Sequence, residues 1–198
     1  MRVDPAEFRA LHLRAHEFLF DSPLHDVWRM RLVGGGPDRT VSEAIELFVD
    51  LASSGLGPMA RALFGLRKVL GRVFGWDLEV PSAAGRSYVH RLSAQDRVRS
   101  LDQPGTKRGL WTSVYTFDRE ALVEIINRTV HALILFTLEP VQGGYTLYWG
   151  IYVKPVNRFT AFYMALIGPF RRHLIYPALI RRFEAAWRRR WEDPGVEA

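Results

Sequence analysis

The sequence predicts an α+β fold of the helix-grip type, in which a twisted antiparallel sheet grips a long C-terminal helix and an extra helix precedes the sheet. Helical periodicity dominates both ends of the chain, whereas β-branched and aromatic residues dominate 110–154. A chain of 198 residues also suits one core better than two. We therefore expect a single domain over 1–198, with an N-terminal helix at 4–20, the sheet and its inserted helices at 24–158, and the C-terminal helix at 159–191.

The first half of the chain is expected to contain helices around one strand. Asp4-Pro5-Ala6-Glu7 is typical of a helix start, because Asp can cap the helix and Pro suits its first position. A strand is expected from Leu24 to Val33, and Gly34-Gly35-Gly36-Pro37 ends it. Thr40-Val41-Ser42-Glu43 is a capping-box pattern that opens a second helix, and Gly57-Pro58 separates this helix from a third.

The second half is expected to supply most of the sheet. Its predicted strands are Ser87–Leu92, Leu110–Phe117, 121–127, Arg128–Leu138 and Tyr145–Lys154. The periodicity of 121–127 fits a helix as well, but its β-branched residues favour a strand. Ser93-Ala94-Gln95-Asp96 predicts a capped short helix, and Pro140–Gly144 predicts a hairpin connection. From Phe159 to Trp191 the pattern is helical, with kinks expected at Gly168-Pro169 and Pro177.

The positive charge of the chain is concentrated near its C-terminus. The net charge is +6, yet residues 158–191 alone hold eight arginines and a single acid, Glu184. The chain has no cysteine, which excludes disulfides, iron–sulfur clusters and thiol chemistry. No apolar leader follows Met1, so we expect a cytoplasmic protein.

Two motifs resemble ligand-binding sites, but a structural role explains each of them better. Gly34-Gly35-Gly36 could cradle a phosphate, but no Lys-Ser/Thr pair follows it, which favours a plain loop between strand and helix. His12 and His16 would share a helix face that suits a metal, yet no third ligand is apparent. We therefore expect neither a metal nor another cofactor.

His131 is the most informative histidine, because its role depends on which face of its strand lines a cavity. The even positions from Val130 to Leu138 are all apolar, whereas the odd positions include His131. If the even face lines the cavity, His131 packs or forms hydrogen bonds on the other side. If the odd face does, His131 is a polar group in an apolar pocket, where its proton chemistry could matter. Burial without a partner is costly, so the structural role is favoured.

Five segments of the chain together resemble a bacterial family of unknown function in the START-like (SRPBCC), helix-grip superfamily. These segments are Pro23–Trp28, Gly34–Pro37, Asn127–Ala132, Tyr148–Pro155 and Tyr163–Arg172. The superfamily includes lipid-transfer, polyketide-cyclase and allergen-type proteins. The resemblance therefore implies a cavity that holds an apolar or amphipathic small molecule, a lipid or an aromatic metabolite, between the sheet and the C-terminal helix.

Aromatic residues are dense in the predicted strands, and either a cavity wall or a solid core explains them. The resemblance implies a cavity, and we expect the following residues to line it: Trp111, Tyr115, His131, Phe136, Trp149 and Tyr163. Ligand binding without strong catalysis is the function we expect. The alternative is a cyclase- or isomerase-type enzyme that uses His131, His90 or Glu124 as acid–base groups.

The arginine-rich helix has three interpretations. A solvated helix face is the simplest of them. Aromatic residues beside the arginines also suit an anionic membrane surface, for which we expect Arg171, Arg172, Arg181 and Arg182 to face the membrane. The longest run of low charge, Phe159–Phe170, is too short to span a bilayer. Specific nucleic-acid binding is the least favoured, because basic charge without a recognition motif gives only non-specific affinity.

Overall fold

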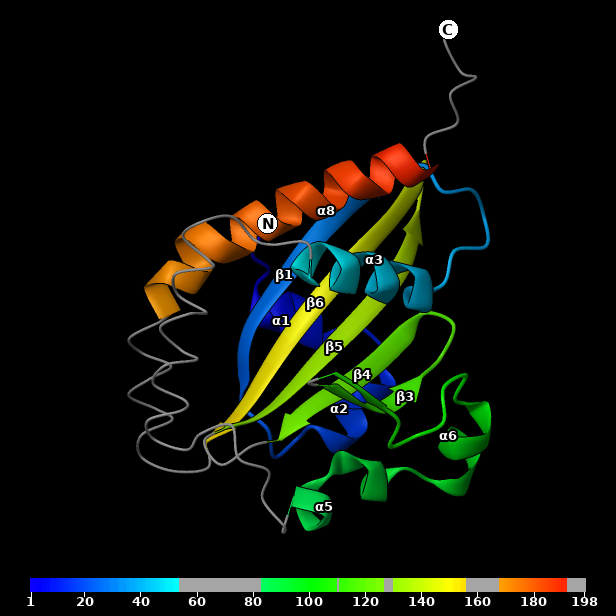
Figure 1. Ribbon diagram of the computed structural model, residues 1–198, viewed down its shortest axis with the longest axis vertical. Helices are drawn as coiled ribbons and strands as arrows, with labels where there is room; N and C mark the ends of the chain where they lie inside the picture. The colour runs from blue at the N-terminus through cyan, green and yellow to red at the C-terminus, as the bar shows by residue number, and fades with distance from the viewer. Residues whose placement is uncertain (54–82, 110, 127–129, 156–167, 192–198) are drawn as a thin grey trace, which may run out of the picture.

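The computed structural model describes residues 1–53, 83–109, 111–126, 130–155 and 168–191 (Figure 1). Its strands are β1 (Leu24–Val33), β2 (Lys107–Arg108), β3 (Trp111–Thr116), β4 (Glu120–Ile126), β5 (Val130–Val141) and β6 (Gly144–Pro155). They form one antiparallel sheet in the order β1-β6-β5-β4-β3-β2. The helical elements are α1 (Pro5–Arg9), α2 (Arg14–Phe18), α3 (Val41–Ser53), α5 (Ala83–Arg86), η1 (Tyr88–Arg91), α6 (Ala94–Arg99), η2 (Arg171–Ile175) and α8 (Tyr176–Trp191).

Each face of the sheet carries its own core. Helices α3 and α8 cover one face, where a large apolar cluster includes Phe48, Phe136 and Phe183 (Figure 1). Helices α1 and α2 cover the other face with η1, where a second cluster includes Phe8 and Tyr115. The α+β fold with a C-terminal helix packed on an antiparallel sheet is confirmed, and it agrees with the helix-grip arrangement.

The N-terminal helix predicted over 4–20 is two short helices instead. Asp4 caps α1 as expected, its side chain accepting from the backbone N–H of Ala6 at 2.7 Å. The chain then becomes extended at Leu13, the residue before α2, because the carboxylate of Glu120 on β4 accepts from the backbone N–H groups that begin the second helix. A tertiary contact from far along the chain therefore ends the helical run that the local pattern favours.

Two predictions in the second half differ in their outcome. The predicted strand Ser87–Leu92 is wrong: Ser87 accepts from the backbone N–H of Val89 and caps the 3₁₀ helix η1. The ambiguous segment 121–127 lies in strand β4 as predicted, up to its last described residue, Ile126. The capped helix after Ser93 and the hairpin between β5 and β6 are also confirmed, the latter with Gly143 at a φ of +78° in the turn.

The C-terminal helix departs from α geometry just before Pro177. Residues 171–175 form a π-turn, η2, in which the backbone N–H of Tyr176 donates to the carbonyl of Arg171. A proline has no N–H and crowds the carbonyl four residues before it, so a widened turn is expected beside Pro177. The helix predicted after Gly57-Pro58, and residues 159–167 of the predicted C-terminal helix, lie outside the described residues.

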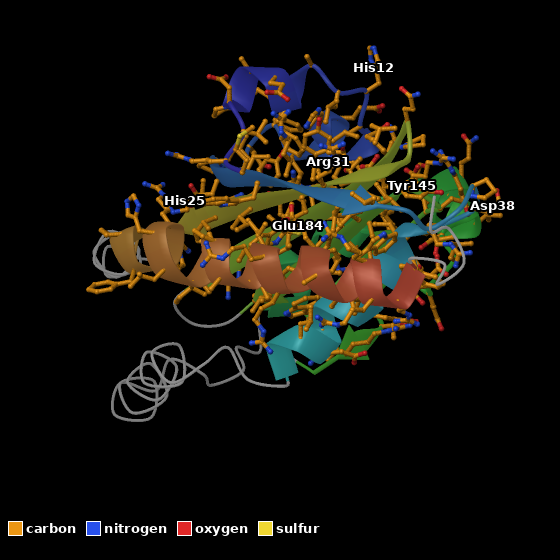
Figure 2. The ribbon with its side chains drawn as sticks, turned by 90° about the horizontal axis from the view of Figure 1, so that it is seen from above. His12, His25, Arg31, Asp38, Tyr145 and Glu184 are labelled. Carbon is orange, nitrogen blue, oxygen red and sulfur yellow. The ribbon has the colours of Figure 1, made fainter. Side chains whose placement is uncertain are left out.

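Strand β1 is at one edge of the sheet, and other parts of the chain cover that edge. The backbone of Met1 and Val3 bonds to Arg29 and Val27 on the strand. Further along, the carboxylate of Glu184 on α8 accepts from the backbone N–H of Arg31 at 2.9 Å (Figure 2). The single acid of the arginine-rich segment thus fastens α8 to the edge strand.

Candidate functional site

Three of the predicted ligand-binding residues lie together beneath α3 and α8. Trp111, Phe136 and Trp149 come from β3, β5 and β6 and belong to the apolar cluster on that face. Phe48 of α3 packs against all three, with ring centroids 6.4, 5.3 and 5.0 Å away respectively. Phe48 was not among the predicted lining residues, because its helical pattern does not indicate which face of the sheet it meets.

Trp149 of β6 also pairs with a tryptophan of the neighbouring strand, Trp28 of β1. We call these two residues the indole pair. The two residues are directly opposite each other in the register of the strands. The ring of Tyr176 lies edge-on to both, at 5.6 and 4.7 Å between centroids. Burial raises the pKa of Tyr176 to about 12, which reflects how little water reaches this group.

The indole pair presents two donors that lack acceptors. Trp28 and Trp149 are only 6% and 5% exposed, and within the described chain neither Nε1 atom has a hydrogen-bond partner. Buried donors are nearly always satisfied, so two neighbouring exceptions require an explanation. Each unsatisfied group costs about 1–3 kcal/mol.

Tyr115 and His131 do not belong to this face, so grouping them with the other lining residues was wrong. The even positions of β5 face α8, as the contacts of Phe136 show, and alternation along the strand therefore turns His131 to the opposite side. Tyr115 packs there against Phe18 of α2. Tyr163, the remaining predicted residue, lies outside the described residues.

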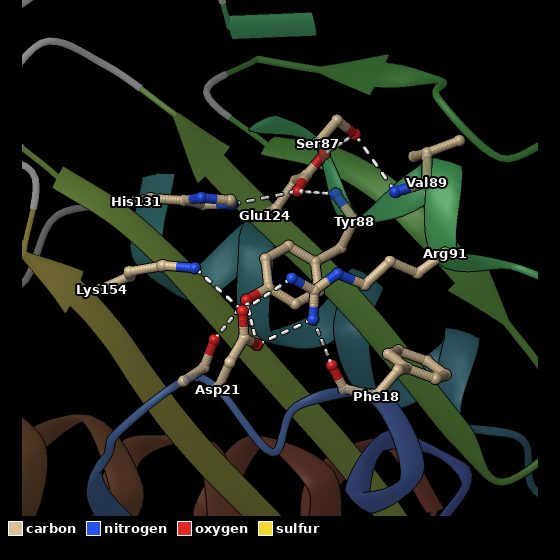
Figure 3. Close-up of polar contacts among 10 residues, drawn as sticks. Phe18, Asp21, Ser87, Tyr88, Val89, Arg91, Glu124, His131 and Lys154 are labelled. Atoms are coloured by element: carbon tan, nitrogen blue, oxygen red, sulfur yellow. Dashed lines mark hydrogen bonds and ion pairs between the residues drawn. The ribbon is translucent and has the colours of Figure 1, made fainter. Parts of the chain in front are cut away.

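His131 forms part of a buried network around Glu124 (Figure 3). Its Nε2 lies 3.2 Å from the carboxylate of Glu124, which also accepts from the backbone N–H of Tyr88 and the hydroxyl of Ser87. His131 and Glu124 are 2% and 1% exposed. His131 therefore forms its hydrogen bond on the side of β5 away from α8, and this pair joins β4 and β5 to η1.

A second ionic group secures the other side of η1. Asp21 accepts two hydrogen bonds from Arg91 at 2.8 and 2.7 Å, and one each from Lys154 and the Tyr88 hydroxyl (Figure 3). The guanidinium of Arg91 is the main reason that the pKa of Asp21 lies far below its ordinary value. His90, the other predicted acid–base histidine, has an exposed side chain on η1.

Two of the arginines expected to face a membrane point into the protein instead. Arg172 donates to the fully buried carboxylate of Asp26 at 3.0 Å, and Arg171 lies 3.5 Å from the same carboxylate with a side chain only 13% exposed. Asp26 sits at a bulge of β1, so the strand irregularity and the π-turn of the helix meet there. Of the four arginines, Arg181 is exposed.

A pocket of about 550 Å³ lies on the face of the sheet away from α8. It is lined by the α1–α2 segment, the end of α6, the turn between β3 and β4, and β5. Its charged and polar residues are Arg9, His12, Arg14, His16, Glu17, Arg99, Arg119, Glu120, Thr137 and Glu139. Figure 2 shows His12 on the opposite side of the sheet from α8. Sequence reasoning noted His12 and His16 but could not supply the other residues of this pocket.

Two half-buried histidines should make the stability of the protein sensitive to mild acid. Burial lowers the pKa of His16 and of His25 below the ordinary value of 6.5. A group whose pKa is lower in the folded state binds fewer protons there, so its contribution is present above about pH 6.5 and decreases as the pH falls below it. We expect the free energy of unfolding to fall between pH 7.5 and 5.5 in urea titrations, and to fall less in the His16→Gln/His25→Gln variant. The exposed His12→Gln variant is the control, and an unchanged slope in the double variant would contradict this assignment.

The described part of the chain contains no group of three histidine or acidic side chains placed to hold a metal ion. Nor is any described helix both long and apolar enough to cross a bilayer.

Comparison with known proteins places the chain in one family. The model of a protein family of unknown function, DUF2867, matches residues 19–178. This segment contains the whole sheet, α3 and the start of α8, whereas α1 and α2 precede it. Neither the curated proteins nor the solved structures yield a match. The chain belongs to the DUF2867 family of proteins of unknown function.

Proposed function

We propose that this protein binds an apolar small molecule that carries a hydrogen-bond acceptor, between the sheet and the layer of α3 and α8. The observation that carries the proposal is the indole pair, whose two neighbouring N–H groups are buried without acceptors. The resemblance to START-like proteins, which hold apolar molecules on this face, supports the same conclusion.

The surroundings of the indole pair define the class of ligand. The rings of Phe48 and Tyr176 pack against Trp149, and Phe136 packs against Phe48. The buried ion pairs of Asp26 with Arg171 and Arg172 lie at the edge of this apolar group, where Arg171 lies over the Tyr176 ring. Sites for small molecules typically combine such apolar walls with a few polar groups that fix orientation. A ligand with an aromatic or aliphatic body and one carbonyl, ether or carboxylate oxygen would satisfy the indoles and keep its body out of water.

A matched pair of probes tests the proposal. We expect 2-acetylnaphthalene, which has a carbonyl acceptor, to bind about fivefold more tightly than 2-ethylnaphthalene, which has the same size and no acceptor. Fluorescence titration measures both affinities. Native mass spectrometry of the freshly purified protein should also show an apolar ligand that was acquired during expression.

Substitutions test whether the indole N–H groups cause the preference for the probe with a carbonyl group. Trp28→Phe and Trp149→Phe keep a smaller aromatic ring at each position and remove the N–H groups, so the double variant should bind both probes equally. Trp187→Phe is the control, because Trp187 also has a buried Nε1 without a partner but packs against Tyr145 and Phe183. Equal affinity of the two probes for the wild-type protein, or a preference that survives in the double variant, would overturn the proposal.

The geometry does not favour the alternative functions. Two of the three candidate acid–base groups, His131 and Glu124, are buried on the opposite face of the sheet, and the third, His90, is exposed on η1. Association with an anionic membrane stays a prediction that rests on Arg181 and the exposed arginines at the end of α8, since Arg171 and Arg172 bind Asp26.

A further inference from the structure

We propose that the pocket between the α1–α2 segment and the ends of β4 and β5 binds a small organic anion that carries a hydroxyl group. The pocket lies on the opposite face of the sheet from the indole pair, so this second site is independent of the function proposed above. Its volume, about 550 Å³, lies within the range of sites for small molecules.

His16 lines the pocket and carries a buried acceptor. Its Nδ1 lies 3.1 Å from the carbonyl oxygen of Leu11, so Nδ1 carries the proton in this contact. In the neutral ring Nε2 is then an acceptor, and this buried atom has no partner in the described chain. Phe8 holds the ring edge-on at 5.4 Å. An O–H group of a ligand is the natural partner for such a nitrogen.

Thr137 supplies a second polar group without a partner. The residue is 1% exposed, lines the pocket and lies opposite Glu120 in the register of β4 and β5. Within the described residues its buried hydroxyl forms no hydrogen bond. A strand position that only needed to fill space would be served as well by valine, so the hydroxyl indicates a ligand atom.

Two of the three acids in the pocket already have partners within the protein. Glu120 accepts from two backbone N–H groups and from the hydroxyl of Tyr115. Glu17 pairs with Arg14, which also binds Asp96.

The remaining charges favour an anion. Arg9, Arg99 and Arg119 form no ion pair with any residue that the structure describes, and Arg99 lies over the ring of Phe117 at 4.5 Å. Glu139 is the acid that stays without a partner in the described chain. The lining carries four arginines against three glutamates, and the three arginines without ion pairs to described residues are available to an anion, because guanidinium groups bind carboxylates and phosphates through two hydrogen bonds at once.

The test uses three probes and isothermal titration calorimetry of the full-length protein at low ionic strength. Malate is a hydroxylated carboxylate, glycerol 3-phosphate is a hydroxylated phosphate ester, and succinate is malate without its hydroxyl. We expect malate or glycerol 3-phosphate to bind about tenfold more tightly than succinate, because succinate leaves His16 and Thr137 unsatisfied. Tighter binding of malate would indicate a carboxylate ligand, and tighter binding of glycerol 3-phosphate would indicate a phosphate ligand.

Variants separate this site from general attraction to a basic protein. Thr137→Val removes a hydroxyl without changing shape, and it should weaken the preferred probe about tenfold while thermal stability is kept or raised. Arg119→Gln should also weaken binding, whereas Arg181→Gln on α8 removes the same charge outside the pocket and should not. No binding of any probe at millimolar concentration, equal affinities for malate, glycerol 3-phosphate and succinate, or unchanged affinity in Thr137→Val would overturn the proposal.

Discussion

Replacing Asp26 by asparagine is expected to lower the free energy of unfolding by about 3–5 kcal/mol, the range measured when one partner of a buried ion pair is removed. The Asp26 carboxylate is fully buried, with Arg172 at 3.0 Å and both Arg171 and Arg2 at 3.5 Å. Without the carboxylate, the guanidinium of Arg171 stays largely buried beside two further positive charges. For a chain of this length the change corresponds to a fall in Tm of about 10 °C. Urea unfolding followed by circular dichroism measures the loss.

Replacing Arg2, an exposed partner of Asp26, should lower the free energy of unfolding far less. The side chain of Arg2 is 55% exposed, and an exposed ion pair contributes about 0–1 kcal/mol. We therefore expect Arg2→Gln to unfold at nearly the wild-type urea concentration. If Asp26→Asn is no less stable than Arg2→Gln, the cluster does not fasten the C-terminal helix to β1.

The second large effect is expected at Glu120. Its carboxylate accepts from the backbone N–H of Arg14 at 2.9 Å, from that of Ala15 at 2.8 Å, and from the hydroxyl of Tyr115. Glu120→Ala leaves these three donors without their acceptor, which costs about 3 kcal/mol at roughly 1 kcal/mol each. Chemical denaturation measures the total.

Hydrogen exchange shows where the loss arises. The amides of Arg14 and Ala15 should exchange faster in Glu120→Ala, while amides in β6 keep their protection relative to global unfolding. Glu139→Ala is the control, since Glu139 lines the same pocket and no described residue is bonded to its side chain. Equal stability of the two variants would show that α2 does not depend on Glu120.

Local sequence signals identified most of the sheet, because its strands are long and bounded by turns. The hairpin at Gly143 and the capped helix at Ser93 follow from chemistry within a few residues, and both are present. The failures have a common cause. The break before α2 depends on Glu120, and the helical turn at Tyr88 is stabilised by Glu124; each carboxylate lies far along the chain.

The candidate site was predicted in part for a similar reason. The strand β5 has leucines at its odd positions and apolar residues at its even ones, so its pattern does not reveal which face meets α8. Trp111, Phe136 and Trp149 lie in one core, whereas Tyr115 and His131 lie on the other face of the sheet. The pocket near His16 could not be predicted from the sequence, because Thr137 joins it only through the pairing of β4 with β5.

The contact of Glu184 with the edge strand has a consequence for self-association. An uncovered edge of a sheet presents free N–H and C=O groups, on which the strand of a second molecule can pair and start aggregation. On β1 the backbone of Met1 and Val3 occupies part of that edge, and the Glu184 carboxylate occupies the N–H of Arg31. The arginine-rich segment thus keeps one acid at the position where it blocks intermolecular β-pairing, and the positive charges around it repel a second copy of the same edge.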